Sequence, residues 1–191
     1  MNRIQLRQLA YNKLMESPNK AISNSVEQDN PVIMDVAEYI GIEITGQGDG
    51  TVKVAKPKNT QATGVQSFNS NKLEAGEHMV IDSMKGEYAL ETADAKEVET
   101  AHYIDSAPAD LMNADVVVKQ GSTELIRLAF SEVHNPNTSQ NNEDNYRVIG
   151  HMPILEAEKP FSIELEFPDG TSLPAGDHFV RFEFRGHKFK K

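Results

Sequence analysis

The clearest pattern in the chain is an alternation of apolar and polar side chains in its last third. Residues 161–167 alternate phenylalanine, isoleucine and leucine with serine and glutamate, and residues 180–185 alternate valine and phenylalanine with arginine and glutamate. A period of two residues is typical of a β-strand with one buried face. A Pro-Asp-Gly turn follows the first segment. We therefore predict two paired strands, with their phenylalanines in the core and with Glu164 and Glu166 opposite arginines of the second strand.

Weaker strand patterns run through the middle of the chain. Residues 32–45 are rich in β-branched side chains and predict one long strand, or two strands that break at Gly41. The glycine-rich stretch 46–50 predicts a hairpin turn into the next strand. Further strands are predicted at 51–55, 64–68, 78–90, 115–119 and 124–130. Short strands separated by turns, with no internal repeat, predict an all-β fold: a single jelly-roll β-sandwich of about eight strands with a short N-terminal helix.

The first residues carry a helical pattern. Between Asn2 and Glu16, the side chains of Ile4, Tyr11 and Met15 fall on one stripe, and a Ser-Pro pair ends the segment. A helix this short is marginal alone, so we expect it to be ordered by its own body, a neighbouring subunit or a membrane. We predict an assembly arm that uses Ile4, Arg7, Tyr11 and Met15. The chain then divides into a helical arm and linker, 1–30, and a β-sandwich domain, 31–191.

The charge of the chain is unevenly distributed. The net charge is −10, yet residues 1–20 hold four Lys/Arg against one acid, and residues 175–191 hold five against two. An acidic body repels nucleic acid, so any contact with a polyanion would have to use the two ends. The alternative is that the basic ends are simply solvated. The candidate residues for contact with nucleic acid or a membrane are Arg3, Arg7, Lys13, Arg185, Lys188, Lys190 and Lys191.

No catalytic or metal-binding constellation stands out. The chain has no cysteine, which excludes disulfides and thiolate sites, and it has no G-x-S-x-G nucleophile motif. Its six histidines contain none of the close pairs that metal sites draw from one strand or helix, so we interpret them as surface or capping residues. Glu164 and Glu166 fit a solvated strand face better than a glycosidase pair. We predict no enzyme, no cofactor, no metal and no small-molecule substrate.

One long polar loop is expected at residues 134–145. It contains no apolar side chain, and loops of about a dozen residues inside compact domains are usually functional or mobile. Its oxygen-rich side chains lack the spacing of a calcium loop. Residues 1–16 lack the apolar run of a signal peptide, and no stretch reaches the ~18 apolar residues that span a bilayer, so we expect a soluble protein.

Three segments resemble parts of a known family. Leu73–Tyr88 (LEAGEHMVIDSMKGEY) resembles the opening strands of the coat jelly rolls of tailless, icosahedral, lipid-containing bacteriophages. Asp115–Leu128 (DVVVKQGSTELIRL) is similar to the hairpin that follows in such proteins, and Phe161–Phe184 resembles their closing strand pair. Major coat proteins of that group carry two stacked jelly rolls, whereas 191 residues hold one. The resemblance therefore implies a single-jelly-roll coat subunit or a minor vertex protein, without catalytic residues.

These observations lead to three hypotheses. The first is a viral structural protein, a capsid or coat subunit that self-assembles into an icosahedral virion shell. The shell would assemble in the host cytoplasm, and the protein would then be part of the virion. Its partners would be copies of itself and other virion proteins, and packaged nucleic acid or an inner membrane at the basic termini. The alternative is a phage receptor-binding or carbohydrate-binding β-sandwich module that uses the loop 134–145. An enzyme on a sandwich scaffold is the third, since a fold alone never fixes function.

Overall fold

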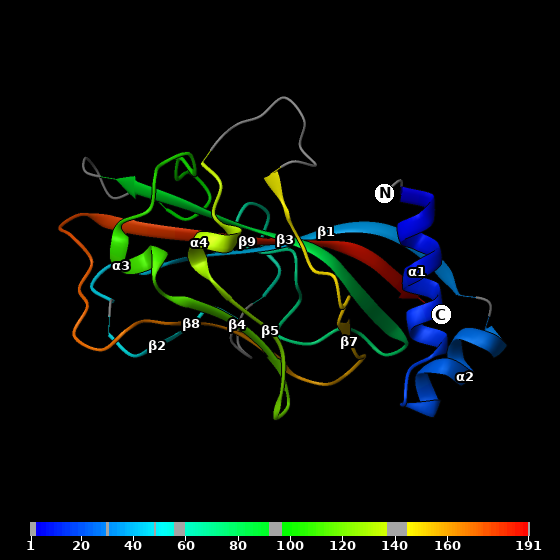
Figure 1. Cartoon of the computed structure of the whole chain (residues 1–191). Helices are drawn as coiled ribbons and strands as arrows, with labels where there is room; N and C mark the ends of the chain where they lie inside the picture. Colours follow the sequence, from blue (N-terminus) through cyan, green and yellow to red (C-terminus); the bar gives the residue numbers. More distant parts are fainter. Residues whose placement is uncertain are drawn as a thin grey trace.

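Two antiparallel sheets lie face to face in the computed structural model, which describes residues 3–29, 31–47, 49–55, 60–91, 97–136 and 145–190 (Figure 1). Sheet A contains, in order, β1 (Val32–Glu43), β9 (Asp177–Lys190), β3 (Glu77–Glu91) and β6 (Arg147–Val148), and β7 (Ile154–Leu155) also pairs with β3. Sheet B contains β2 (Thr51–Lys53), β8 (Phe161–Glu166), β4 (Asp115–Gln120) and β5 (Thr123–Ala129). The helices are α1 (Arg3–Met15), α2 (Lys20–Asp29), α3 (Ala109–Met112) and α4 (Phe130–Val133).

The chain changes sheet between most consecutive strands. It crosses at each step from β1 to β4, makes the β4–β5 hairpin within sheet B, returns to sheet A for β6 and β7, and crosses twice more through β8 to β9. The strand pairs are antiparallel. When β6 and β7 are counted as one strand position, this winding is that of a jelly roll. The structure thus confirms the predicted all-β sandwich with a short N-terminal helix.

Apolar side chains from both sheets fill the space between them. Sheet A contributes Met84, Phe182 and Phe184, and sheet B contributes Val118 and Ile163 to one continuous buried cluster. Facing sheets pack in this way when each strand directs alternate residues inward. The four phenylalanines predicted to lie in the core are all buried there: Phe161, Phe167, Phe182 and Phe184. The interior of the sandwich is therefore a packed core.

Two predicted strand pairings are wrong. The stretch 46–50 does turn the chain, but β1 and β2 belong to opposite sheets, so it forms a corner of the sandwich instead of a hairpin. β8 and β9 are also in opposite sheets, and the outer glutamates of β8 therefore face β4 and β5, not the arginines of β9. Period-two alternation specifies which face of a strand is buried, and it does not specify the neighbouring strand. Within residues 64–68, Gln66 forms isolated bridges to Ile40 and Ala62 instead of the predicted strand.

The N-terminal segment packs on the outer face of sheet A (Figure 1). Ala10 and Leu14 of α1 are fully buried against Val80 of β3 and Phe189 of β9. Helix α2, which lies in the predicted linker, adds buried apolar side chains to the same cluster. The predicted apolar stripe is therefore displaced on α1: Ile4 is 80% exposed. The helix is ordered by packing against its own body, one of the three expected options.

Candidate functional site

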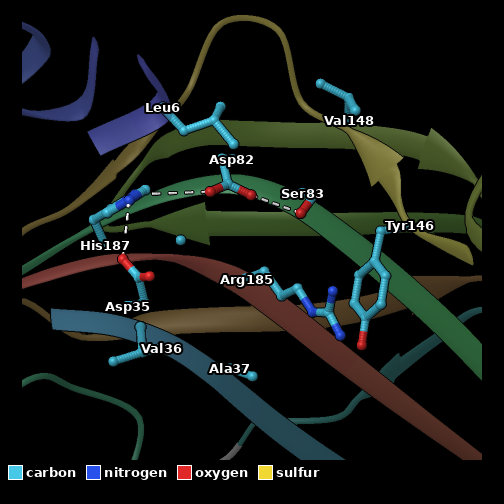
Figure 2. Close-up of a pocket in the computed structure, with 11 residues that line it drawn as sticks. Leu6, Asp35, Val36, Ala37, Asp82, Ser83, Tyr146, Val148, Arg185 and His187 are labelled. Atoms are coloured by element: carbon cyan, nitrogen blue, oxygen red, sulfur yellow. Dashed lines mark hydrogen bonds and ion pairs between the residues drawn. The ribbon is translucent and has the colours of Figure 1, made fainter. Parts of the chain in front are cut away.

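A groove on the outer face of sheet A gathers the most distinctive polar side chains of the described residues (Figure 2). It has a volume of about 470 Å³ and lies across β1, β9 and β3, with α1 on one side and β6 on the other. Apolar side chains border it, and charged ones form its floor. Its lining residues include Leu6, Asp35, Asp82, Ser83, Tyr146, Val148, Arg185 and His187.

A β-bulge in β3 supplies two of these polar groups. The register between β3 and β9 shifts between Ile81, which pairs with Gly186, and Ser83, which pairs with Arg185. The extra residue, Asp82, therefore joins Ser83 at the groove. The Ser83 hydroxyl donates a hydrogen bond of 2.6 Å to Asp82 Oδ1. Bulges commonly redirect side chains in this way beside functional surfaces.

Glycine is required on the strand opposite the bulge. A Cβ atom added at Gly186 would lie 1.9 Å from the carbonyl oxygen of Val80, which is far inside van der Waals contact. The clash is with backbone, so no side-chain rotation relieves it. Close approach of β3 to β9 at this point therefore depends on residue 186 having no side chain.

His187 joins three strands at the floor of the groove. Its ring is 3% exposed, with Nε2 3.3 Å from Asp35 Oδ1 on β1 and Nδ1 3.7 Å from Asp82 Oδ2 on β3. The imidazole therefore lies between carboxylates of the two neighbouring strands. The Ser83 hydroxyl donates to Asp82 and not to the ring, so this is not a serine–histidine nucleophile pair.

The guanidinium group of Arg185 lies over the Tyr146 ring at the other end of the groove. Its guanidinium carbon lies 3.6 Å from the centroid of the Tyr146 ring, a cation–π contact, and its Nε lies 3.8 Å from Glu183 Oε1. The Tyr146 hydroxyl donates to the same glutamate oxygen at 2.5 Å. Burial and, secondarily, this bond to Glu183 raise the pKa of Tyr146 well above its usual value. The groove thus presents a fixed cation at one end and two carboxylates at the other.

The predicted assembly arm is partly used within the molecule. Tyr11 and Met15 pack against the cluster under α1, whereas Arg7 and Ile4 are exposed. Ala10 and Leu14, which carry most of this packing, were not predicted, although their i, i+4 spacing was visible in the sequence.

The predicted basic contact residues lie on two elements, α1 and β9. Arg3 begins α1, and Lys13 is exposed on the same helix, whereas Arg185, Lys188 and Lys190 belong to β9, a central strand. Lys188 Nζ lies 2.5 Å from Glu38 Oε1, and Lys190 Nζ lies 2.8 Å from Glu77 Oε1. Lys191 lies outside the described residues. The charge of β9 is thus largely matched by carboxylates of its neighbours, which a count of charges along the sequence does not show.

The histidines differ from their predicted surface role at two positions. His178 and His187 are buried. The His178 Nε2–H group donates to the carbonyl oxygen of Pro174 at 2.7 Å, so Nδ1 accepts the hydrogen bond of the Tyr88 hydroxyl at 2.7 Å. The other predicted feature, the loop 134–145, lies outside the described residues from 137 to 144. Among the residues that are described, no group of three or more His, Asp or Glu side chains is placed to hold a metal ion.

The groove residues Asp35, Asp82, Tyr146 and His187 were not predicted from the sequence. The one local signal is Asp82, which interrupts an apolar run in β3.

None of the helices in the described parts of the chain has the length and apolar character needed to cross a membrane. Comparison with known proteins gives no match: no family model fits the chain, and no curated protein or solved structure is detectably similar to it.

Proposed function

We propose that this chain is a structural subunit, a capsid or coat protein that self-assembles into a virion shell after synthesis in the host cytoplasm. The observation that carries the proposal is the filled jelly roll: two sheets wound in jelly-roll order around a continuous apolar core. Such a body acts through its outer faces and sheet edges, because the space between its sheets is occupied by side chains. Viral capsid domains are one established use of this architecture.

Other uses of the architecture are less well supported. Jelly-roll enzymes of the cupin type work inside the barrel, where this chain places side chains such as Phe182 and Ile163. The groove on sheet A lies outside the barrel, and its serine is bonded to a carboxylate instead of a base. A structural role requires neither an internal site nor an activated nucleophile.

Electron microscopy and light scattering of the purified full chain test the proposal. We expect closed particles or defined oligomers that grow with protein concentration. A strictly monomeric protein at the highest attainable concentration, with no particles in the microscope, would contradict a self-assembling subunit. Adding the other proteins of its native source is a useful extension, since a minor vertex subunit assembles on its neighbours.

The groove favours one second candidate, a receptor-binding or carbohydrate-binding module. Its carboxylates, Asp35 and Asp82, can accept hydrogen bonds from sugar hydroxyls, and Arg185 can donate them. Binding on a glycan array or to host cells that is lost in Asp35→Ala, and kept in Glu124→Ala on sheet B, would support this candidate. Absence of binding by the full chain would remove it.

A further inference from the structure

The charged groups of the groove on sheet A are separated by sign. At its acidic end, Asp35 of β1 and Asp82 of β3 lie on either side of His187, and Arg185 of β9 lies at its basic end (Figure 2). A single imidazole offsets at most one of two carboxylates, so the acidic end is negative whichever form the ring takes. The Asp35 side chain is 50% exposed, and a ligand can therefore reach this carboxylate from solvent.

The cation at the basic end is held in place and is still accessible. The Tyr146 ring lies against the Arg185 guanidinium, and Glu183 lies 3.8 Å from its Nε. These contacts use one face of the guanidinium plane and Nε. The two terminal nitrogens are the part of an arginine that binds a carboxylate through two parallel hydrogen bonds. The Arg185 side chain is 22% exposed and lines the groove, so we expect an anionic group to bind there.

The space between the two ends is low and has an apolar border. The residues that pair with Arg185 on its two neighbouring strands are Ala37 and Ser83, both of them small. Leu6 of α1 and Val148 of β6 border the groove on one side, and Val148 is 66% exposed (Figure 2). A ligand that lies along the groove would therefore place its charges at the two ends and an apolar chain beside these side chains.

The register of the strands sets the length of such a ligand. Asp35 pairs with His187, and Ala37 pairs with Arg185. Two residues of a strand span about 7 Å, and the Arg185 side chain extends from there toward Tyr146, away from His187 (Figure 2). The opposite charges of the groove therefore lie about 7 Å or more apart. In an α-amino acid a single carbon separates the two charged groups, which is too short to meet both ends.

We propose that this groove binds a small zwitterion in which an apolar chain holds an ammonium group and a carboxylate about 7 Å apart. The ammonium group donates to the carboxylates of Asp35 and Asp82, and the ligand carboxylate accepts from Arg185. The apolar chain packs beside Leu6 and Val148. This inference goes beyond the proposed function and does not depend on assembly, because the groove is formed within one chain.

Charge matching favours a zwitterion over the other occupants of a groove of this size. A cation without a carboxylate meets the guanidinium of Arg185 at one end, and an anion without an amine meets two carboxylates at the other. The hydroxyls of a neutral sugar can bond to both ends, but they neutralise neither charge. Buried or half-buried charges are stabilised best by a partner of opposite sign.

Calorimetric titration of the full chain at neutral pH with 6-aminohexanoate tests the proposal, because the extended chain of this probe has the required length. We expect saturable binding. Hexanoate lacks the ammonium group, and hexylamine lacks the carboxylate, so each should bind at least about tenfold more weakly. The isomer 2-aminohexanoate has the same atoms with both charged groups on one carbon, and it should lose as much.

Two contrary results would overturn the proposal. One is equal affinity for 6-aminohexanoate and 2-aminohexanoate, which would show that the separation of the charges is not recognised. The other is the absence of saturable binding of 6-aminohexanoate. Saturable binding of neutral methyl glycosides together with no binding of 6-aminohexanoate would assign the groove to sugars instead.

Variants assign each end of the ligand to its partner. In Asp35→Asn, the affinity for 6-aminohexanoate should fall about tenfold, and its advantage over hexanoate should disappear. In Arg185→Gln, the advantage over hexylamine should disappear. Ala37→Trp fills the middle of the groove from an exposed position and should abolish binding without a change of charge. Glu124→Gln, at an exposed position on sheet B, is the control and should bind like wild type.

Circular dichroism and thermal unfolding show whether a variant still folds. If Arg185→Gln is unfolded, Asp35→Asn and Ala37→Trp, both at exposed positions, still decide the question. Unchanged binding in these two folded variants would place the ligand elsewhere and contradict the proposal. A chain that assembles but does not bind the probe removes this inference alone, whereas a monomeric chain that binds it removes the subunit role alone.

Discussion

The outer faces of the two sheets differ in how they treat charge. On sheet B, Arg127 lies 2.8 Å from Asp115 and 2.7 Å from Glu166, and its side chain is 38% exposed. The result is a ladder of ion pairs that is exposed around Arg127 and also includes Lys119 and the buried Glu164. On sheet A, helices cover one end of the outer face, and the polar side chains between them and β6, such as His187 and Arg185, are mostly buried.

This difference predicts how strongly the charged residues of each face are constrained. Exposed ion pairs contribute little to stability and tolerate substitution, which suits a surface that only meets water. Burying charged groups costs free energy unless they are matched, so the matched set on sheet A is constrained by its surroundings. The groove belongs to sheet A. We therefore expect substitutions to have unequal effects on the two faces.

The largest effect is expected for a buried ion pair on the inner side of sheet A, where alternation along β1 and β9 directs Glu38 and Lys188. In Lys188→Met, the carboxylate of Glu38, which is 8% exposed, loses the ammonium group 2.5 Å away. An uncompensated buried charge typically costs about 3–5 kcal/mol. Chemical denaturation should show a loss of this size in the free energy of unfolding. A loss below about 1 kcal/mol would mean that the pair behaves like those on sheet B.

A large effect is also expected beneath α1. Leu14→Ala removes a fully buried side chain from the contact with Val80 and Phe189, and such truncations cost about 2–5 kcal/mol. Leu9→Ala, on the same helix but 43% exposed, is the matched control and should cost well under 1 kcal/mol. Thermal unfolding compares the two. Equal effects would show that α1 does not pack on sheet A as described.

Acid should destabilise the fold through two half-buried histidines, His78 within β3 and His134 beside that strand. Burial lowers the folded-state pKa of both His134 and His78 from 6.5. His134 accepts a hydrogen bond from the Ala107 N–H group, and His78 accepts one from Ala157. As the pH falls, the unfolded chain therefore takes up protons at these histidines at a higher pH than the folded chain does. The free energy of unfolding should decrease as the pH drops below about 6.5, and it should level off below the folded-state pKa values.

The pH dependence has its own control. In His134→Gln, the slope of unfolding free energy against pH below 6.5 should become shallower, whereas His151→Gln, at an exposed position, should leave it unchanged. Urea titrations at several pH values measure the slope. A wild-type chain that gains stability on acidification in this window would contradict the assignment.

The smallest effect is expected on sheet B. Arg127→Met removes the centre of the ion-pair ladder, and we expect a loss of at most about 1 kcal/mol, because the side chain is more than one-third exposed. Molar salt should reduce the difference further by screening. A loss approaching that of Lys188→Met would overturn the contrast between the buried ion pair of sheet A and the exposed ion pairs of sheet B.

The sequence predicted the strands better than their neighbours. Alternation located β8 and β9 and the buried phenylalanines, because a period of two residues is a property of a single strand. The pairing of β8 with β4 depends on contacts between distant segments, so it was predicted wrongly. The groove was missed for the same reason. Asp35, Asp82 and His187 come from three strands, and only the register and the bulge at Asp82 bring them together.

Helix α2 was missed although Ile22 and Val26 have the i, i+4 spacing of one helix face. The segment is short and otherwise polar, and its apolar side chains are buried only by packing with α1 and Phe189. The basic residues of β9 show the same dependence on tertiary structure. Lys188 and Lys190 resemble a solvated tail in the sequence, yet both are paired to carboxylates in the fold.

The most direct test of the structural-subunit role is the oligomeric state of the purified full chain over a wide range of protein concentrations. If the chain acts through its outer faces and sheet edges, light scattering and electron microscopy should show defined oligomers or closed particles whose share grows with concentration. A chain that stays strictly monomeric at the highest attainable concentration would contradict this role.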